Sequence, residues 1–565
     1  MLKTHKKSQA FRKEWLKKVE LKEVINFAHV RDVFFRGQRK ASAIAPFASV
    51  LFCKRSEVQA HKNYVLYWSA KKTAMVKELQ AVVLSVVDRH VVRQADFLRN
   101  DTLWKIYWWG NHRDVALISA INLYTPLGVL HDPDNSGQGF PKGIENTKPS
   151  GFLLEYKQLP VKNFQRYGSI NSNDFKQPPA RVNRRGKASF YQGDRLLIKH
   201  GITQSSDQKG QIIARMESAK FCFTNSINCI KLIQPETWKY KVILGILWSS
   251  LPRYYFFLTS SKWGIWHDGI YMDEYLNLPI TLPTDNKLGK RIVRIVEELQ
   301  NWNQVERYEL VKRVRDSRLN TIPIIWLLIG RINCIAGMIF LYKFHNYQIQ
   351  LNNQLTDLEY SLDEAIFDLY ELNKSERDLI RDMCDVGIEF FYNHSNSQAV
   401  QSLDIKFLPK LQGTIDDISN IRGNQNHIQG YIYTFLNIWN RELEPDGEFN
   451  WKVIDAETNS SMLAIVFSTQ EKNTSLPDRY NYNSSEDEWK EILGSIDKHN
   501  LVPYDSHQIY IDGMIRVVSD TQIIIIKRNE MRLWTRSMAR EDAEATLLQA
   551  IHLQENTQSD GGEVL

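Results

Sequence analysis

Four cations stand close together in the segment PPARVNRRGKASF (178–190), and their spacing suits the binding of phosphate groups. Pro178 and Pro179 exclude a regular helix at the start of the segment, so the sequence predicts an exposed loop. Arginine and lysine donate charge-assisted hydrogen bonds to phosphate oxygens. The candidate phosphate-binding residues of this loop are Arg181, Arg184, Arg185 and Lys187.

The segment that follows, GDRLLIKHGI (193–202), has a short apolar run with a charged residue at each end. This pattern predicts a β-strand over the apolar run. Arg195 and Lys199 are the charged ends, and they join the candidate phosphate-binding residues.

The positive charge of the chain is concentrated in two blocks. Residues 1–60 contain 14 Lys and Arg against 5 Asp and Glu, and residues 151–220 contain 13 against 5. The net charge of the whole chain is only +7, so the remainder is slightly acidic. Cations gathered in this way indicate a polyanionic partner such as DNA. The alternative is two solvated surface patches without a partner.

Length and composition predict a cytoplasmic protein of several globular domains. A chain of 565 residues is long enough for about three or four domains of ~150 residues. The five cysteines form no CxxC pair and have no histidine at ligand spacing, which indicates reduced buried thiols. The basic N-terminus lacks the apolar stretch of a secretory signal. Residues 322–342 are apolar, but Arg331 and Asn333 lie at their centre, so we expect a buried helix and no membrane span.

The periodicity of apolar residues predicts a multidomain protein with α/β and α+β parts. Helices are expected over residues 11–27, from Asp114 onward, and over 241–258, 287–319, 351–369 and 535–554. Strands are expected over residues 43–55, 63–70, 103–109, 451–456, 461–467, 507–518 and 521–528. The Gly- and Pro-rich segment 131–151 is expected to be a domain boundary.

Several segments, taken in order, resemble the C-terminal portion of adenine-specific N-6 DNA methyltransferases of restriction–modification systems. The first two are RDVFFRGQRKASAIAPFASVLFCKR (31–55) and ADFLRNDTLWKIYWWGNHRDVALI (95–118), which are similar to the region after the catalytic motif. GDRLLIKHGI, SSLPRYYFFLTSSKWGI and EYLNLPITLP resemble parts of the target recognition domain. LDEAIFDLYELNKSERDLI (362–380) is similar to the helical segment that often follows, so the resemblance covers roughly residues 25–390.

The resemblance implies a division into domains. Residues 1–130 are expected to be the C-terminal part of a methyltransferase-like α/β domain with a partial sheet, and residues 150–285 a target recognition domain. A helical domain over 287–392 and an α+β domain over 400–553 are expected to follow, before a disordered tail over 554–565.

The resemblance also bears on LPRYYFFLTSSKWGIW (251–266). On composition alone its aromatic residues favour an ordinary core. The resemblance implies that Tyr254, Phe256 and Phe257 belong mostly to the core and that a loop turns toward DNA. The candidate residues of that loop are Ser260, Ser261, Lys262 and Trp263.

Two motifs of the same family are missing from the sequence. The family binds S-adenosylmethionine with a Gly-rich turn after a strand and holds the flipped adenine with an Asn/Asp/Ser-Pro-Pro-aromatic motif. The only Pro-Pro lies in KQPPAR, and the Gly-x-Gly of SGQGF (136–140) follows no strand pattern. The resemblance therefore implies no catalytic, cofactor or metal site on this chain. It implies a separate catalytic subunit that carries S-adenosylmethionine and binds residues 1–130.

Two other functions remain open at this point. Pro477-Asp478 with Glu488 and Lys490 has the residue types of a magnesium-dependent restriction nuclease, in which carboxylates hold the metal. That chemistry normally lies on a strand hairpin, whereas RYNYNSSEDEWKEIL (479–493) predicts a loop entering a helix. The third possibility is a DNA-binding adaptor without catalysis, in which residues 400–565 have a structural role.

Overall fold

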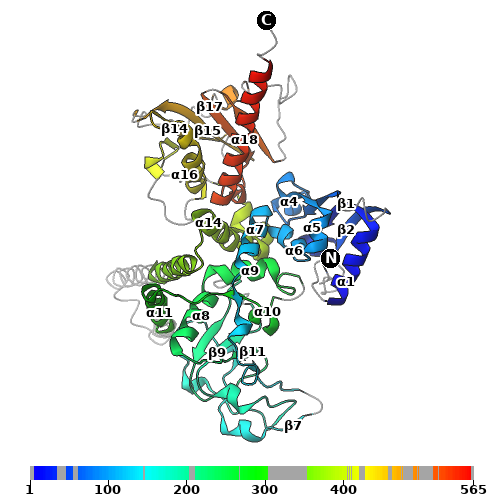
Figure 1. Cartoon of the computed structure of the whole chain (residues 1–565), viewed down its shortest axis with the longest axis vertical. Coiled ribbons are helices and arrows are strands. Elements are labelled where there is room, and N and C mark those ends of the chain that lie inside the picture. The colour runs from blue at the N-terminus through cyan, green and yellow to red at the C-terminus, as the bar shows by residue number, and fades with distance from the viewer. Residues whose placement is uncertain are drawn as a thin grey trace, which may run out of the picture. The chain divides into compact units, whose positions relative to one another are not determined.

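The structure, a computed structural model, divides into two compact units (Figure 1). Unit 1 combines residues 1–115 and 373–565, and unit 2 is residues 116–372. The first division falls inside helix α7 (His112–Ile121), upstream of the segment 131–151. The structure describes residues 6–34, 46–54, 62–79, 81–143, 147–202, 210–265, 268–302, 353–403, 405, 408, 410–418, 427–455, 461–472, 474, 488–492, 494, 513–519 and 521–560.

Unit 1 begins with a four-stranded sheet in the order β2-β1-β3-β4. Strand β1 (Val19–Asn26) pairs antiparallel with β2 (Ala48–Lys54) and parallel with β3 (Tyr64–Ser69). Strand β4 (Arg89–Arg93) pairs antiparallel with β3. One face of the sheet carries the buried residues Val24, Tyr67 and Val92. Helices α1 (Lys6–Lys18), α5 (Gln94–Arg99) and α6 (Leu103–Trp109) pack on this sheet.

The helix predicted over residues 11–27 is correct only as far as Lys18. From Val19 the chain is the strand β1, whose residues are half or fully buried in the sheet. The buried side chain of Gln94 stabilises this change of structure. Its amide donates to the carbonyls of Leu16 and Val19 at 2.7 and 2.8 Å and accepts from the Leu21 N–H at 2.8 Å. A residue more than 70 positions away thus satisfies the backbone where the helix ends.

Two strand predictions for unit 1 are wrong in part. Residues 103–109 are helix α6, because Trp104 and Trp108 lie one helical turn apart and both are buried on the same face. The strand expected to be buried over 43–55 is the edge strand β2. Its side chains are mostly exposed, with Leu51 60% and Phe52 47% accessible.

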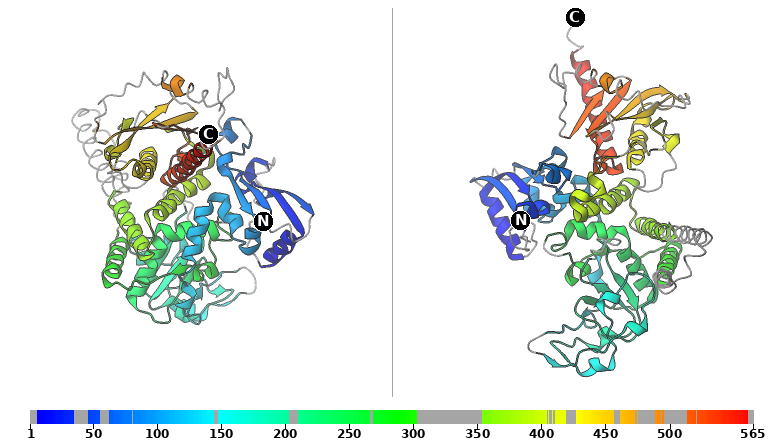
Figure 2. Two further views of the ribbon diagram at one scale, coloured as in Figure 1. Left: turned by 45° about the horizontal axis from the view of Figure 1, so that its top comes forward. Right: turned by 180° about the vertical axis from the view of Figure 1, so that it is seen from behind.

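A second sheet in unit 1 has five antiparallel strands in the order β13-β14-β15-β17-β16. They are β13 (Gln412–Gly413), β14 (Gly447–Asp455), β15 (Met462–Glu471), β17 (Gln522–Arg528) and β16 (Met514–Val518). Helices α16 (His427–Trp439) and α18 (Arg536–Asp560) contribute to the core on one face of this sheet (Figure 2). The four predicted strands are thus confirmed where they are described. Helix α18 continues to Asp560, into the segment expected to be a disordered tail.

Three helical pieces precede this sheet in unit 1. They are α14 (Lys374–Asp382), a π-helical turn (Met383–Gly387) and α15 (Ile388–Asn393). Asn373 caps α14 by accepting the Glu376 N–H at 3.1 Å, and the Glu376 carboxylate in turn accepts the Asn373 N–H. This capping box explains why the helix begins at Lys374.

Unit 2 contains a sheet in the order β10-β9-β11-β6. Its strands are β10 (Ala214–Glu217), β9 (Arg195–Lys199), β11 (Ile227–Ile230) and β6 (Gly137–Gln138). Strand β9 confirms the prediction for 193–202. Two-residue strands form the pairs β12 (Pro279–Ile280) with β5 (Thr125–Pro126) and β7 (Lys148–Pro149) with β8 (Arg181–Val182). Helix α11 (Asn286–Gln300) begins the predicted segment 287–319, and residues 353–369 are helical.

The single helix predicted over residues 241–258 is two helices, α8 (Thr237–Trp248) and α9 (Ser250–Thr259), bent by 61°. Ser249 is extended between them, and Pro252 lies in the first turn of α9, where its missing N–H costs no helical hydrogen bond. Among the described residues no single helix is long and apolar enough to cross a membrane, although this bent pair passes by length and composition. The segment 322–342 lies outside the described residues.

Candidate nucleic-acid interface and polar cavity

The predicted phosphate-binding loop lines a concave surface of unit 2 with a volume of about 620 Å³. Its cationic lining residues are Lys148, Arg184, Arg185 and Lys187, and we call this surface the basic hollow. None of the described residues that line it is an aspartate or a glutamate. The lining residues thus include four cations and no carboxylate, and the carboxylate of Asp134 lies outside the lining, 3.6 Å from Lys187 Nζ.

Internal hydrogen bonds fix the shape of the loop. Arg185 Nε donates to the carbonyl of Pro149 at 2.8 Å, and the Tyr191 hydroxyl donates to the carbonyl of Arg185 at 2.8 Å. Between them Gly186 has a φ of +73°, and a Cβ there would lie 2.9 Å from the Tyr191 hydroxyl. Glycine is required at this turn because a side chain would be both strained and obstructed.

The cations in and beside the loop differ in whether hydrogen bonds within the protein already engage their side chains. Arg184 and Lys148 are exposed, and neither side chain makes a hydrogen bond or ion pair with the residues that the structure describes. Lys187 is exposed, and its Nζ donates to the Asp134 carbonyl at 2.6 Å. Arg181 lies on β8 beside the hollow, and its guanidinium donates to the carbonyl of Thr147 at 2.6 Å. Arg184 and Lys148 are therefore the cations most available to bind a phosphate.

Arg195 lies in the interior of unit 2, whereas the sequence predicts that it binds phosphate. It is 0% exposed on β9, and its guanidinium donates to the carbonyls of Gly193 and Ala219 at 2.8 Å each. Burial lowers the pKa of Arg195. A side chain enclosed in this way holds the sheet together, and we leave it out of the proposed interface. Lys199, at the other end of β9, is half-buried.

The segment expected to turn toward DNA is largely interior. Trp263 is 0% and Ser260 2% exposed, and Trp263 packs edge-on against Phe257 with ring centroids 5.5 Å apart. The carboxylate of Glu274 accepts hydrogen bonds from the Ser260 hydroxyl at 3.2 Å and the Ser261 N–H at 2.6 Å. Trp263 and Ser260 therefore build the core of unit 2, which is the role composition alone favoured for the aromatics.

Lys262 of the same segment faces a small polar group. Its Nζ lies 3.0 Å from Nε2 of His200 and 4.8 Å from the centroid of the Tyr271 ring. Burial lowers the pKa of His200, and the charge of Lys262 lowers it further. Lys262 and Ser261 are half-buried.

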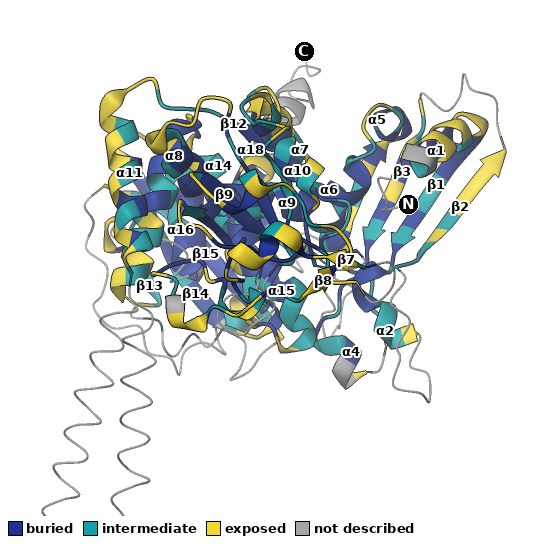
Figure 3. Cartoon of the chain, turned by 90° about the horizontal axis from the view of Figure 1, so that it is seen from below, coloured by how far each residue is buried: buried dark blue, intermediate teal, exposed yellow. Residues whose placement is uncertain are grey.

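The first sheet of unit 1 has one apolar face that the described helices leave accessible. Leu51, Glu23, Leu66 and Val91 stand side by side across β2, β1, β3 and β4. The side chains of Leu51, Leu66 and Val91 are 60%, 38% and 59% exposed. Figure 3 shows the exposed strand β2 at the edge of this sheet. We call this surface the open sheet face.

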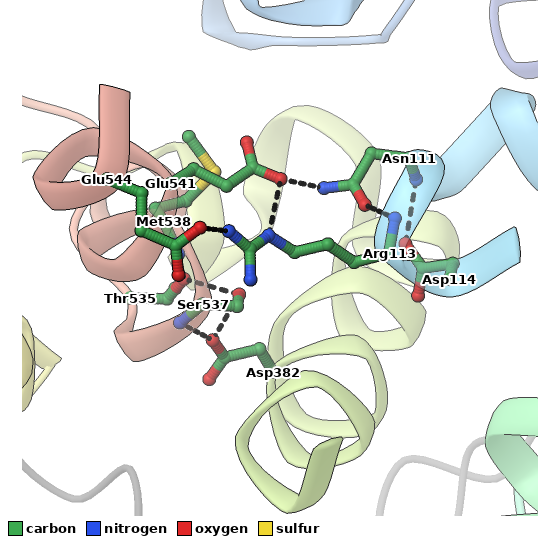
Figure 4. A network of polar contacts seen from close by, with 9 residues as sticks. All are labelled: Asn111, Arg113, Asp114, Asp382, Thr535, Ser537, Met538, Glu541 and Glu544. Carbon is green, nitrogen blue, oxygen red and sulfur yellow. Dashed lines mark hydrogen bonds and ion pairs between the residues drawn. The ribbon is translucent and has the colours of Figure 1, made fainter. Parts of the chain in front are cut away.

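Sequence reasoning missed a cavity of about 380 Å³ in unit 1, which we call the polar cavity. Its wall includes residues from β3, β4, α6, α14 and α18. One side is the network drawn in Figure 4, which joins the starts of α7 and α18. Asn111 donates to Glu541, Arg113 pairs with Glu544, and Asp382 accepts from the Ser537 N–H at 2.8 Å.

The other side of the polar cavity carries buried cations. Nη1 of Arg532 donates to both carboxylate oxygens of Asp88 at 2.9 and 3.1 Å, and Nε of Arg532 donates to Glu530 at 2.8 Å. The Lys71 side chain is 5% exposed and donates to the carbonyl of Trp108. Its Nζ also lies 3.5 Å from the centroid of the Trp109 ring.

Burial brings the pKa values of two lining residues, Lys71 and Glu541, close to 7. It lowers the pKa of Lys71 to about 7 against the opposing charge of Asp88, and it raises the pKa of Glu541 to about 7 against the charge of Arg113. Burial also lowers the pKa of His90 to about 4. Perturbed titratable groups in a cavity are typical of functional sites. No local motif marks this site, because its residues come from segments more than 400 positions apart.

The residues of the nuclease alternative are only partly described. Asp478 and Pro477 lie outside the described residues. Glu488 pairs with Lys452 of β14, and residues 488–492 are helical, as predicted. Among the described residues, no group of three or more His, Cys, Asp or Glu is placed to hold a metal ion.

Comparison with known proteins leaves the family of this chain open. No protein-family model matches the sequence, and no curated protein is detectably related to it.

Proposed function

We propose that this chain is the DNA-recognition subunit of a split adenine-specific N-6 DNA methyltransferase in a restriction–modification or phage-defence system. Unit 2 binds duplex DNA through the basic hollow. A separate catalytic subunit holds S-adenosylmethionine and transfers the methyl group. We assign methyl transfer to that subunit because the sequence of this chain has neither the Gly-rich turn nor the Pro-Pro-aromatic motif.

The observation that carries the DNA part of the proposal is the basic hollow. Lys148, Arg184, Arg185 and Lys187 line it without a carboxylate, and Arg184 is exposed. Duplex DNA carries one negative charge per about 1.7 Å of helix axis, so several cations in one hollow can contact neighbouring phosphates at once. Such contacts position a duplex, and the bases are then read by other side chains.

The open sheet face supports the partner part of the proposal. Three apolar side chains and Glu23 lie in a row across the sheet, and β2 offers an edge whose outer backbone groups no described strand pairs. A free edge beside an apolar face is a template for association. A methyltransferase subunit with its own sheet fits this surface, and a stable complex would bury about 2,000 Å² or more.

The DNA part is tested by fluorescence anisotropy with a labelled duplex at increasing salt concentration. Replacing Arg181, Arg184, Arg185 and Lys187 together by Ala should weaken binding at least about tenfold. The slope of log affinity against log salt should fall by about 0.9 for each phosphate that the variant no longer neutralises. A matched control removes four exposed cations of α11 in the same unit: Lys287, Lys290, Arg291 and Arg294. Equal effects of the two variants would mean that DNA does not bind in the hollow.

The partner part is tested by co-expression with a methyltransferase subunit encoded beside this chain. The complex should transfer tritiated methyl groups to adenine in DNA, and the chain alone should transfer none. Leu51→Asp and Val91→Asp should each prevent assembly because they place a charge on the open sheet face. Leu123→Asp is the control, since Leu123 is 87% exposed in unit 2. Complexes that form equally well with all three variants would exclude the open sheet face as the interface, and DNA binding without any partner would favour the adaptor function.

A further inference from the structure

The polar cavity of unit 1 contains hydrogen-bond donors without acceptors. Among the described residues, no acceptor forms a hydrogen bond with Nη2 of Arg532 or Nε1 of Trp108, and both atoms are buried. Both residues line the cavity. A buried donor without an acceptor is costly, so such groups in a native protein usually have a ligand or an ordered water as a partner.

Lys71 adds a cation to the same wall. Its Nζ donates to a backbone carbonyl and contacts an aromatic ring, and it forms no ion pair with the residues that the structure describes. The nearby carboxylate of Asp88 is occupied by both of its bonds to Arg532. An ammonium group that is almost fully enclosed, and whose neighbouring carboxylate is already bonded to Arg532, favours an incoming anion.

The carboxylates of the cavity, by contrast, have donors. Glu541 accepts from Asn111, Asp382 accepts from Ser537, and Asp114 accepts the Asn111 N–H at 2.7 Å (Figure 4). The donors without acceptors named above therefore lie on one side of the polar cavity. The wall around Lys71, Arg532 and Trp108 has donors without acceptors, whereas the three carboxylates on the opposite side have donors.

The size and surface of the cavity limit what it can hold. A volume of about 380 Å³ lies in the usual range for small-molecule sites. The rings of Trp108, Trp109 and Phe390 line it, and the Trp109 and Phe390 centroids are 5.7 Å apart. Aromatic walls of this kind pack well against a flat ring.

We propose that the polar cavity binds a small organic anion, a phosphate monoester or carboxylate on a planar ring, whose anionic oxygens accept from Lys71, Arg532 and Trp108. The site is independent of the proposed function, because it lies in unit 1 and uses none of the residues of the basic hollow or the open sheet face. Its failure would therefore leave the DNA proposal standing.

The experiment is calorimetric titration of the full chain at pH 6.5 with four probes. Adenosine 5′-monophosphate and benzoate offer a ring with a phosphate or a carboxylate, inorganic phosphate offers the anion alone, and adenosine offers the ring alone. At least one of the two ring-bearing anions should bind with a Kd below about 1 mM. Adenosine and inorganic phosphate should bind at least about tenfold more weakly than that anion, because each lacks one half of the recognised group.

Two conservative variants locate the site. Lys71→Met keeps the length of the side chain and should weaken binding about tenfold or more, because it removes a charge-assisted hydrogen bond. Trp108→Phe keeps an aromatic ring but removes the N–H together with part of the indole, and it should weaken binding about threefold to tenfold. Lys17→Met is the matched control, since the Lys17 side chain is 49% exposed on α1, outside the cavity.

Hydrogen exchange on the unmodified chain gives a second measurement that does not depend on variant folding. The tighter-binding anion should slow amide exchange in residues 103–110 and 531–535, which contribute to the cavity wall. No saturable binding of either ring-bearing anion, or binding that Lys71→Met leaves unchanged, would overturn the proposal. Binding with protection confined to unit 2 would overturn it as well.

Discussion

The basic hollow of unit 2 and the polar cavity of unit 1 both collect cations, but they hold them in opposite environments. In the hollow, Arg184 and Lys148 are exposed on short, irregular elements, and water solvates their charges. In the cavity, Lys71 is enclosed and Arg532 is paired with Asp88. An exposed cation can interact with a large polyanion, and salt screens that interaction. The charge of a buried cation depends on whether it keeps its proton, which burial and the neighbouring groups determine.

This difference affects how each charge contributes to stability. Exposed charges cost the folded state little, since they are as well hydrated as in the unfolded chain. The buried Lys71 loses that hydration, which lowers its pKa to about 7. We therefore expect the buried charge of the polar cavity to make stability depend on pH. We expect the exposed charges of the basic hollow to make DNA affinity depend on salt concentration.

The largest effect is expected from the pH dependence of stability at Lys71. Between pH 7 and 10 the folded chain holds this amine mostly neutral while the unfolded chain holds it protonated, so unfolding takes up a proton at Lys71 and the contribution of Lys71 to stability rises with pH. In Lys71→Met this contribution is absent. The difference in unfolding free energy between the two proteins should change by about 1.4 kcal/mol per pH unit in this window. Equilibrium urea unfolding at pH 7.5, 8.5 and 9.5 measures it, and parallel curves would mean that Lys71 is not buried as a free amine.

The next effect separates a buried arginine from an exposed one within unit 2. Arg195→Met leaves the carbonyls of Gly193 and Ala219 without their donor, and we expect stability to fall by about 2–4 kcal/mol. Arg184→Met should change stability by less than about 0.5 kcal/mol. Urea unfolding of the two variants gives the comparison directly. A large destabilisation by Arg184→Met would contradict its placement in solvent.

The smallest effect is a change in salt dependence. Arg184→Met should lower the slope of log DNA affinity against log salt by about 0.9, the contribution of one neutralised phosphate. Lys71→Met should leave that slope unchanged, since the cavity lies outside the proposed DNA surface. Anisotropy titrations between about 50 and 200 mM salt resolve this difference. Should Lys71→Met lower the slope instead, the two regions would not be separate in function.

The fold was predictable where a segment depends on its own residues. The apolar run of β9 and the β-branched residues of β17 identify strands without reference to the rest of the chain. Prediction was wrong where distant residues decide the structure. Val19–Asn26 continues a helical pattern, but Gln94 and the neighbouring strands hold it as β1. The bend between α8 and α9 has a local signal, Ser249 followed by Pro252, that the apolar pattern concealed.

The candidate sites divide in the same way. Arg184 and Lys187 were identified from charge, proline and glycine, and the structure places both in the basic hollow. Arg195 was chosen for its charge and Trp263 because the resemblance implied a loop turned toward DNA, and both lie in the interior. Exposure is a property of packing, so residue type alone does not distinguish these two outcomes.

The sequence by itself determined the position of the basic loop, because Pro178, Pro179 and Gly186 fix an irregular backbone and four cations follow it wherever the loop lies. It also determined the strands β9, β14, β15 and β17, whose apolar runs are long enough to specify a strand locally. Only the tertiary structure decided that β2 is an edge, that Arg195 is enclosed and that the polar cavity exists. Asp88 and Arg532 are 444 residues apart, and their pairing arises only when the chain brings β4 and the start of α18 together. Burial, which sets the charge of Lys71, is likewise a consequence of residues far from it in sequence.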